Sequence, residues 1–278
     1  MTKIKGENKE MSVAFHIVVC GSLVPDPLQT LTPVMGAAGP ALKNELMLPA
    51  VLDPFAAHAL YEAANLVKKA PGSKIWLVSL GNKAKLQQMM MTVAQKVEFE
   101  LVALDGSASG FTDSFETATA LAKAIEGIAG LERERLLLFG GCASASRDAG
   151  TTLQMVGERL GLADQFLAVD ELDVQDDGSL KIWERIEVGS YQVSVCAGAP
   201  AVLGWATGNL PEPPNNPQIG MKNMRTVMPA LQRAAKVPLA AGAAFAAVEL
   251  PAQQRQTRIV KDMPVDGIAQ EIVDWLKK

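Results

Sequence analysis

The chain has 278 residues, a formal net charge of −4 and 49% apolar residues, of which few are aromatic. That length allows one large or two modest domains with a hydrophobic core, and the acidic balance argues against a nucleic-acid-binding protein. Three widely spaced cysteines and two distant histidines exclude a disulfide framework, a zinc site and a multi-histidine metal centre. No apolar stretch reaches the ~20 residues of a membrane span. We therefore expect a reduced, cytoplasmic protein that is not integral to a membrane.

The N-terminal part of the chain predicts four β-then-α units, which follow a polar leader at residues 1–12 that we expect to be disordered. The expected strands are short apolar runs at residues 14–20, 74–80, 99–104 and 135–139. The expected helices follow strand-ending turns, at residues 53–69, about 82–96, 113–129 and 151–160. Units that alternate in this way indicate an α/β fold, with a mostly parallel sheet flanked by helices.

The pattern changes in the second half of the chain. Residues 165–197 contain three alternating or apolar runs and an Asp-Asp-Gly turn at 176–178, which predict an antiparallel hairpin excursion. With one more strand, this excursion belongs to an α/β domain over residues 13–208. The proline- and asparagine-rich stretch 209–225 is expected to be a surface loop, followed by a C-terminal arm at 226–278 with a short helix and a terminal helix.

Small residues gather at the carboxyl ends of the predicted parallel strands, where open α/β sheets bind ligands. The first strand ends in Cys20-Gly21-Ser22, the second in Leu80-Gly81-Asn82, and the fourth runs into GGCASASRDAGTT at residues 140–152. Small side chains let backbone N–H groups approach a phosphate, and the start of the next helix adds partial positive charge. The pattern is typical of a nucleotide cradle, although it matches neither the Rossmann nor the P-loop signature. A turn without a ligand is the alternative.

No group of residues suggests catalysis by this chain alone. His16 lies inside the first strand and His58 within the first helix, where we expect it at the surface or partly packed. Neither histidine has a clear route to Cys20 or Cys142, which we interpret as buried structural thiols. Arg147 is the one basic side chain near the expected phosphates. We therefore expect that this chain is not an enzyme by itself.

Taken in order, several motifs resemble the β subunit of electron transfer flavoproteins. They are S-L-V-P-D-P after the first strand, D-P-F at the first helix, L-V-S-L-G at the second strand, the GG…RDAG…VGERLG segment, and A-P-A-V before a later strand. The resemblance covers about residues 14–235. It implies the α/β fold expected above, a heterodimer with an α subunit that holds FAD, and AMP bound in this chain.

The resemblance also implies roles for particular residues. A recognition loop at 209–225 would dock a flavin dehydrogenase through Ile219 or Met221, and the C-terminal arm would contact the α subunit. Electrons would pass to a downstream acceptor such as an electron transfer flavoprotein:quinone oxidoreductase. The implied cofactor-binding residues are Cys20, Asp53, Pro54, Phe55, Leu80, Gly141, Cys142, Ala143, Asp148, Ala149, Gly150, Thr151 and Thr152.

The chain departs from the family pattern at several places, among them Asp53 in place of the usual Asn, Ser22 in place of a basic residue, and a lysine-poor stretch at 222–233. The expected phosphate loop reads S-R-D-A-G-T-T and lacks an acidic doublet, and the N-L-P-E-P-P stretch lacks the arginine and tyrosine usual there. The change in the N-L-P-E-P-P stretch suggests a partner other than a typical acyl-CoA dehydrogenase. Two alternatives stay open: a bifurcating-type subunit that binds a second FAD and NAD(H), and an adenine-nucleotide-binding module without a redox role.

Overall fold

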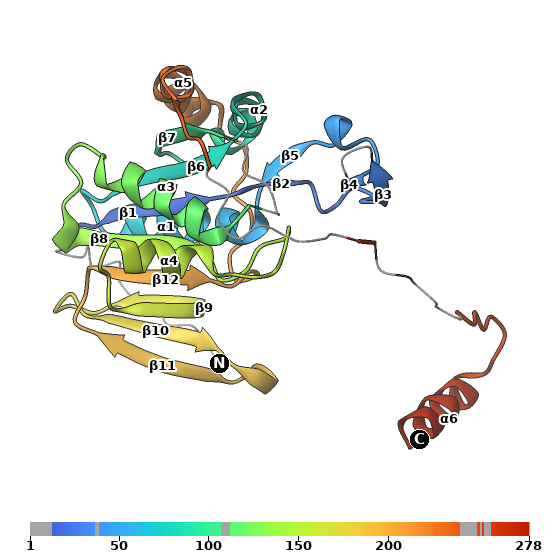
Figure 1. Ribbon diagram of the computed structural model, residues 1–278. Helices are drawn as coiled ribbons and strands as arrows, with labels where there is room; N and C mark the ends of the chain where they lie inside the picture. The colour runs from blue at the N-terminus through green and yellow to red at the C-terminus, as the bar shows by residue number, and fades with distance from the viewer. Residues whose placement is uncertain are drawn as a thin grey trace.

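The computed structural model describes residues 13–36, 39–106, 112–239, 249–250, 252 and 257–277, so the polar leader lies outside the described residues. Within them, one nine-stranded sheet has the order β11-β10-β9-β12-β8-β1-β6-β7-β13 (Figure 1). Its strands are β1 (His16–Gly21), β6 (Lys74–Gly81), β7 (Glu100–Asp105), β8 (Leu136–Gly141), β9 (Gln165–Val174), β10 (Leu180–Arg185), β11 (Tyr191–Cys196), β12 (Ala201–Trp205) and β13 (Ala235–Lys236).

The sheet is parallel from β9 to β13, whereas β10 and β11 are antiparallel. This confirms the α/β fold and the hairpin excursion that the sequence predicts. The chain adds β6 and β7 on one side of β1, and then β8 and β12 on the other. The strand order therefore reverses between β1 and β8, which defines the topological switch point of the sheet.

Helices cover both faces of the parallel part of the sheet (Figure 1). Helices α1 (Pro54–Lys69), α2 (Lys83–Val93) and α5 (Pro217–Gln232) pack against one face, and α3 (Ser114–Glu126) and α4 (Thr152–Arg159) against the other. The side chains of each strand alternate between the two cores: Ile17 and Val19 of β1 enter the first core and Val18 enters the second. Continuous apolar strands are what a sheet buried on both faces requires.

Side-chain caps decide where most of these helices begin. Asp53 accepts a hydrogen bond from the backbone N–H of Phe55 at the start of α1, and Asn82 and Asp113 act in the same way for α2 and α3. Because each cap follows directly after a strand end or a short loop, the helix starts lie at the carboxyl edge of the sheet. This edge carries the candidate site described below.

Two short pairs of strands occupy the stretch between the strand expected at 14–20 and the helix expected at 53–69, where the sequence predicts neither strand nor helix. Strand β2 (Leu23–Pro25) pairs with β5 (Ala50–Leu52), and β3 (Pro33–Gly36) pairs with β4 (Gly39–Leu42). A short 3₁₀ turn, η1 (Glu45–Met47), connects β4 to β5. Strands of three or four residues that contain Pro and Gly are too short to show a periodic pattern.

The predicted surface loop at 209–225 is wrong in its second half, because α5 begins at Pro217. The side chain of Asn216 accepts hydrogen bonds from two backbone N–H groups of the first turn, and Pro217 occupies the first helical position. The buried Asn223 then fixes the helix, since its amide donates to the carbonyl oxygens of Ala94 and Val97 at 2.7 and 2.6 Å. The packing of Asn223 makes these residues part of the folded domain.

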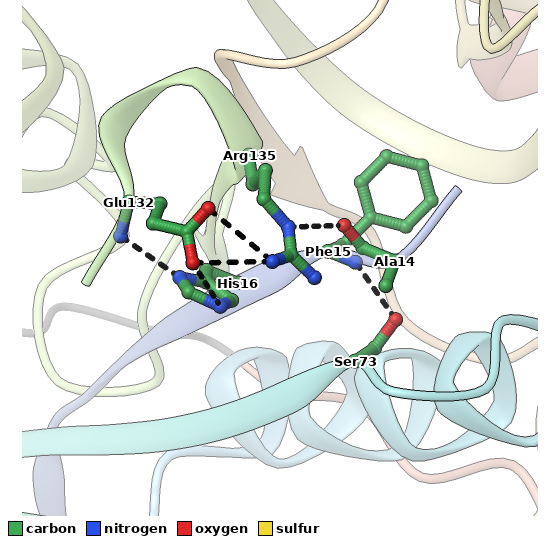
Figure 2. A network of polar contacts seen from close by, with 6 residues as sticks. All are labelled: Ala14, Phe15, His16, Ser73, Glu132 and Arg135. Carbon is green, nitrogen blue, oxygen red and sulfur yellow. Dashed lines mark hydrogen bonds and ion pairs between the residues drawn. The ribbon is translucent and has the colours of Figure 1, made fainter. Parts of the chain in front are cut away.

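The opposite, amino edge of the sheet is held by a polar network (Figure 2). Arg135 donates to the carbonyl oxygen of Ala14 at 2.8 Å and pairs with Glu132 at 3.2 Å. The backbone N–H of Glu132 donates to Nδ1 of His16 at 2.9 Å. An accepting Nδ1 requires a neutral ring in its Nε2–H tautomer, and burial, together with the Arg135 cation, lowers the pKa of His16. His16 therefore has a structural role far from the carboxyl edge.

The predicted C-terminal arm at 226–278 starts within α5, and after that helix it extends the sheet. Strand β13 pairs with β7, and after it the chain reaches α6 (Val265–Leu276), which lies apart from the α/β domain in Figure 1. None of the residues of α6 is buried, and its apolar side chains, among them Val265, Trp275 and Leu276, are exposed. Of the helices that the structure describes, none has the length and apolar character needed to cross a membrane.

Candidate nucleotide-binding cleft

A cleft of about 150 Å³ opens at the carboxyl ends of β1 and β8. Cys20 and Gly21 at the end of β1 and Gly140 and Gly141 at the end of β8 line it, together with the starts of α3 and α4. The cleft therefore lies at the topological switch point, where open α/β sheets bind their ligands.

At two glycines the neighbouring atoms lie too close for a side chain: Gly141 at the end of β8 and Gly150 in the loop that follows. A Cβ atom on Gly150 would lie 2.0 Å from the carbonyl oxygen of Cys142, and the backbone there has a left-handed φ of 58°. A Cβ on Gly141 would lie 2.4 Å from Cβ of Phe55. These contacts fold the loop onto β8 and α1, so that backbone, rather than side chains, forms this wall of the cleft.

Asp53 connects this loop to α1. Its side chain is 1% exposed; one carboxylate oxygen accepts from the N–H of Phe55 at 3.0 Å and the other from the N–H of Ala145 at 2.8 Å. Burial raises the pKa of Asp53, while the backbone N–H groups of Ala145, Phe55 and Ala56 lower it. Both oxygens are thus used by the fold, so Asp53 shapes the cleft and is poorly suited to proton transfer.

Hydroxyl groups and one arginine give the cleft its polar character. The lining hydroxyls come from Ser22, Thr112, Ser114, Thr117, Ser144, Ser146, Thr151 and Thr152. Arg147 also lines the cleft and donates to the carbonyl oxygen of Thr112 at 3.3 Å and to Oγ of Ser114 at 2.5 Å. Helix α4 begins at the same wall, and Thr151 provides no side-chain cap for its first N–H groups. This donor-rich surface suits an anionic, hydroxylated ligand such as a nucleotide.

The cysteines near the cleft are unreactive thiols. Burial raises the pKa of Cys20 to about 12, and it also raises the pKa of Cys142. Both side chains are half-buried, and Cys20 lines the cleft directly. At neutral pH the thiolate form is therefore scarce, which argues against a nucleophilic role.

The cleft brings together most, but not all, of the residues that the sequence singled out. The predicted residues that do not line it are Pro54, Phe55, Cys142 and Asp148. Sequence reasoning missed Ser114 and Thr117 on α3 and Thr112 just before its Asp113 cap, although a strand followed by a helix cap is the same signal. The predicted residues that line the cleft are Cys20, Asp53, Leu80, Gly141, Ala143, Ala149, Gly150, Thr151 and Thr152.

His58, expected at the surface or partly packed, is fully buried. The side chain is buried at 5% exposure between α1 and the sheet, with its ring edge-on to Trp205. Its Nε2 lies 3.4 Å from a carboxylate oxygen of Glu62, one turn further along the helix. Neither histidine lines the cleft, and within the described residues no group of three His, Cys, Asp or Glu side chains could hold a metal ion.

A family model described as "Electron transfer flavoprotein domain" matches residues 44–251, which is well over half of the chain. The chain belongs to the electron transfer flavoprotein family. A search among curated proteins finds no match. The matched range includes α1 and the loop after β8, and therefore most of the cleft of this electron transfer flavoprotein chain.

The residues expected to dock a partner lie on the first turns of α5 in this electron transfer flavoprotein chain. Met221 is 66% exposed, whereas Ile219 is half-buried. Residues 209–216, which precede the helix, contain three prolines and no regular secondary structure. The exposed end of α5 and this short segment form one contiguous stretch of surface chain.

Proposed function

We propose that this chain is the β-type subunit of a heterodimeric electron transfer flavoprotein, with an adenine nucleotide, AMP in the first instance, in the cleft at the β1/β8 switch point. The observation that carries the proposal is the coincidence of the family match with a donor-rich cleft. The nucleotide phosphate would meet the backbone of Gly150 and Thr151 and the uncapped start of α4. The remaining cleft residues would hold the nucleoside.

In this proposal the redox chemistry belongs to an FAD held mainly by an α subunit, because a flavin carries the electrons and the protein provides binding and orientation. Proteins of this family are electron carriers rather than catalysts. The lack of an acid–base pair among the described cleft residues agrees with such a role, since the carboxylate of Asp53 is taken up by two backbone N–H groups. Electrons would enter from a flavin dehydrogenase and leave to a downstream acceptor.

The partner surfaces of the proposed heterodimer differ in character. The apolar side chains of α6 would pack against the α subunit, because an amphipathic helix with no buried residue leaves an apolar face to cover. The dehydrogenase would meet Met221 at the start of α5 only transiently, as a carrier with several partners requires. Of the two predicted anchors, Met221 is the better one because Ile219 is half-buried.

Coexpression of the full chain with the product of the neighbouring gene tests this proposal. We expect a one-to-one complex that contains one FAD and releases AMP, or another adenine nucleotide, on acid treatment. Two flavins per complex would favour the bifurcating-type subunit. A stable, colourless, solitary chain that releases an adenine nucleotide would refute the electron-transfer role and favour the nucleotide-binding module.

A further inference from the structure

The ring of His16 joins the start of β1 to the turn that leads from α3 into β8 (Figure 2). Its side chain is 2% exposed, and its Nδ1 accepts the backbone N–H of Glu132 at 2.9 Å. An accepting Nδ1 offers a lone pair, so the proton of the neutral ring lies on Nε2. A proton from solvent would have to occupy this same lone pair. One nitrogen is therefore both the hydrogen-bond acceptor and the site of protonation.

The surroundings of the ring hold it in this orientation. The ring lies edge-on to the buried Trp76, with the two ring centroids 5.2 Å apart. Its Nε2 is 3.9 Å from a carboxylate oxygen of Glu132, which is beyond hydrogen-bond distance, and the same carboxylate accepts from Arg135 at 3.2 and 3.3 Å. Protonation would therefore replace the hydrogen bond at Nδ1 by two N–H groups that face each other, and the Glu132 carboxylate would offset this only in part.

Most of the charges around the ring also oppose a cation at this position. Burial lowers the pKa of His16, the Arg135 and Lys74 cations lower it as well, and the Glu132 carboxylate raises it. Lys74 pairs with His16 from β6, and the partner on β8 is the apolar Leu136. The neutral ring thus stabilises the fold above the unfolded pKa of about 6.5, and this contribution is lost as the pH falls through the lower folded value.

The turn that His16 holds contacts the far ends of two helices that line the cleft. It follows the end of α3 and contains a 3₁₀ segment, η2 (Arg133–Arg135). From this segment Arg133 donates to the carbonyl oxygen of Gly161, just beyond the end of α4, at 3.0 Å. Both helices line the cleft near their starts. A change in the turn therefore acts on the ends of α3 and α4 that lie opposite the cleft.

We propose that residues 131–135 form a pH-sensitive clasp, which neutral His16 closes and which opens when a proton from solvent binds to Nδ1. The proton takes the lone pair that accepts the N–H of Glu132, so the turn loses this hydrogen bond to β1. The hydrogen bond from Arg135 to the carbonyl oxygen of Ala14 and the pairing of β1 with β8 do not depend on this lone pair. Opening of the clasp is therefore a local change that leaves the domain folded. This inference does not depend on the proposed nucleotide site.

Amide hydrogen exchange of the full chain, with any subunit that co-purifies, tests the clasp between about pH 7.5 and about pH 5. After correction for the intrinsic exchange rate, we expect protection of the Glu132 amide to fall about fivefold or more in the wild type, as the loss of one buried hydrogen bond gives. His16→Asn keeps an acceptor oxygen near the position of Nδ1 and does not ionise, so its protection should change less than about twofold. His58→Gln is the matched control, since the other histidine contacts Trp205 and should leave the wild-type response intact.

NMR of isotope-labelled histidine in the wild type follows the protonation of the His16 ring directly. We expect the Glu132 amide to lose protection at the same pH at which Nδ1 becomes protonated. An equal pH response in the wild type and His16→Asn would overturn the clasp. A ring that becomes protonated while the Glu132 amide stays protected would overturn it as well, and so would a ring that remains neutral over the whole range. Because the last two outcomes need only the wild type, the test holds even if His16→Asn does not fold.

Discussion

Replacing Asp53 by Asn should destabilise the domain although the two side chains have the same shape. The carboxylate accepts one backbone N–H on each oxygen at a site that is 1% exposed. An amide keeps one acceptor, and its NH₂ group would face the N–H of Ala145. Because a buried donor left without a partner costs about 1–3 kcal/mol, we expect the free energy of unfolding at pH 7 to fall by about that amount.

The pH dependence of the unfolding free energy gives a second test of the same substitution. Burial raises the folded-state pKa of Asp53, so the wild type loses part of its stability as pH rises from the unfolded pKa of about 3.9 through the folded value, while the hydrogen bonds to the carboxylate remain. The Asn variant lacks this loss. The difference in unfolding free energy between the two proteins should therefore narrow as pH rises above about 4.

Urea unfolding of the wild type and Asp53→Asn at pH 4 to 7 measures both effects. Asp177→Asn is the matched control: this exposed carboxylate uses a single oxygen for both of its hydrogen bonds to Ser179, which an amide can keep. It should change stability by less than about 0.5 kcal/mol. Equal stability of Asp53→Asn and wild type at pH 7 would refute the two-acceptor argument.

Three further substitutions test other parts of the structure. Asn223→Leu leaves two buried carbonyl oxygens unpaired and should lower the unfolding free energy by roughly 2–3 kcal/mol in urea titrations; an unchanged midpoint would contradict the role given to Asn223. Gly150→Ala should destabilise more than Gly130→Ala and weaken nucleotide binding, because both glycines have positive φ but only Gly150 has backbone within 2.0 Å of the new Cβ. Equal effects would count against the close contact with the loop. Met221→Ala should slow electron transfer from the partner dehydrogenase severalfold without lowering flavin content, whereas the control Met47→Ala, at an even more exposed methionine, should leave the rate unchanged; equal rates in wild type and Met221→Ala would exclude Met221 as an anchor.

Much of the domain was predictable because its elements carry local signals. Apolar runs such as 74–80 and caps such as Asp53-Pro54 mark strands and helix starts within a few residues of their observed ends. Ligands bind at the carboxyl ends of parallel strands, and this rule predicts from the sequence alone a site near Cys20 and Gly141. The same rule, applied to Asp113, would also have found the contribution of α3.

Other features could not be read from local signals. Asn216-Pro217 has the same capping pattern as Asp53-Pro54, but the surrounding prolines and asparagines also favour a loop. The hydrogen bonds of Asn223 to the segment after α2 hold the helix in place. The buried ring of His58 packs against Trp205, which is distant in sequence and lies on β12 in the core that α1 covers. Such positions depend on partners that only the folded chain brings together.

The sequence by itself determined the α/β class, the order of the main elements and the position of the cleft along the strands, because periodicity, caps and turns are properties of short segments. The tertiary structure alone decided which groups face one another: Asp53 with the N–H of Ala145, and Arg147 with Thr112 and Ser114. These pairs join segments that are 33 to 92 residues apart. Their distances arise from the packing of helices on the sheet, which no local pattern encodes.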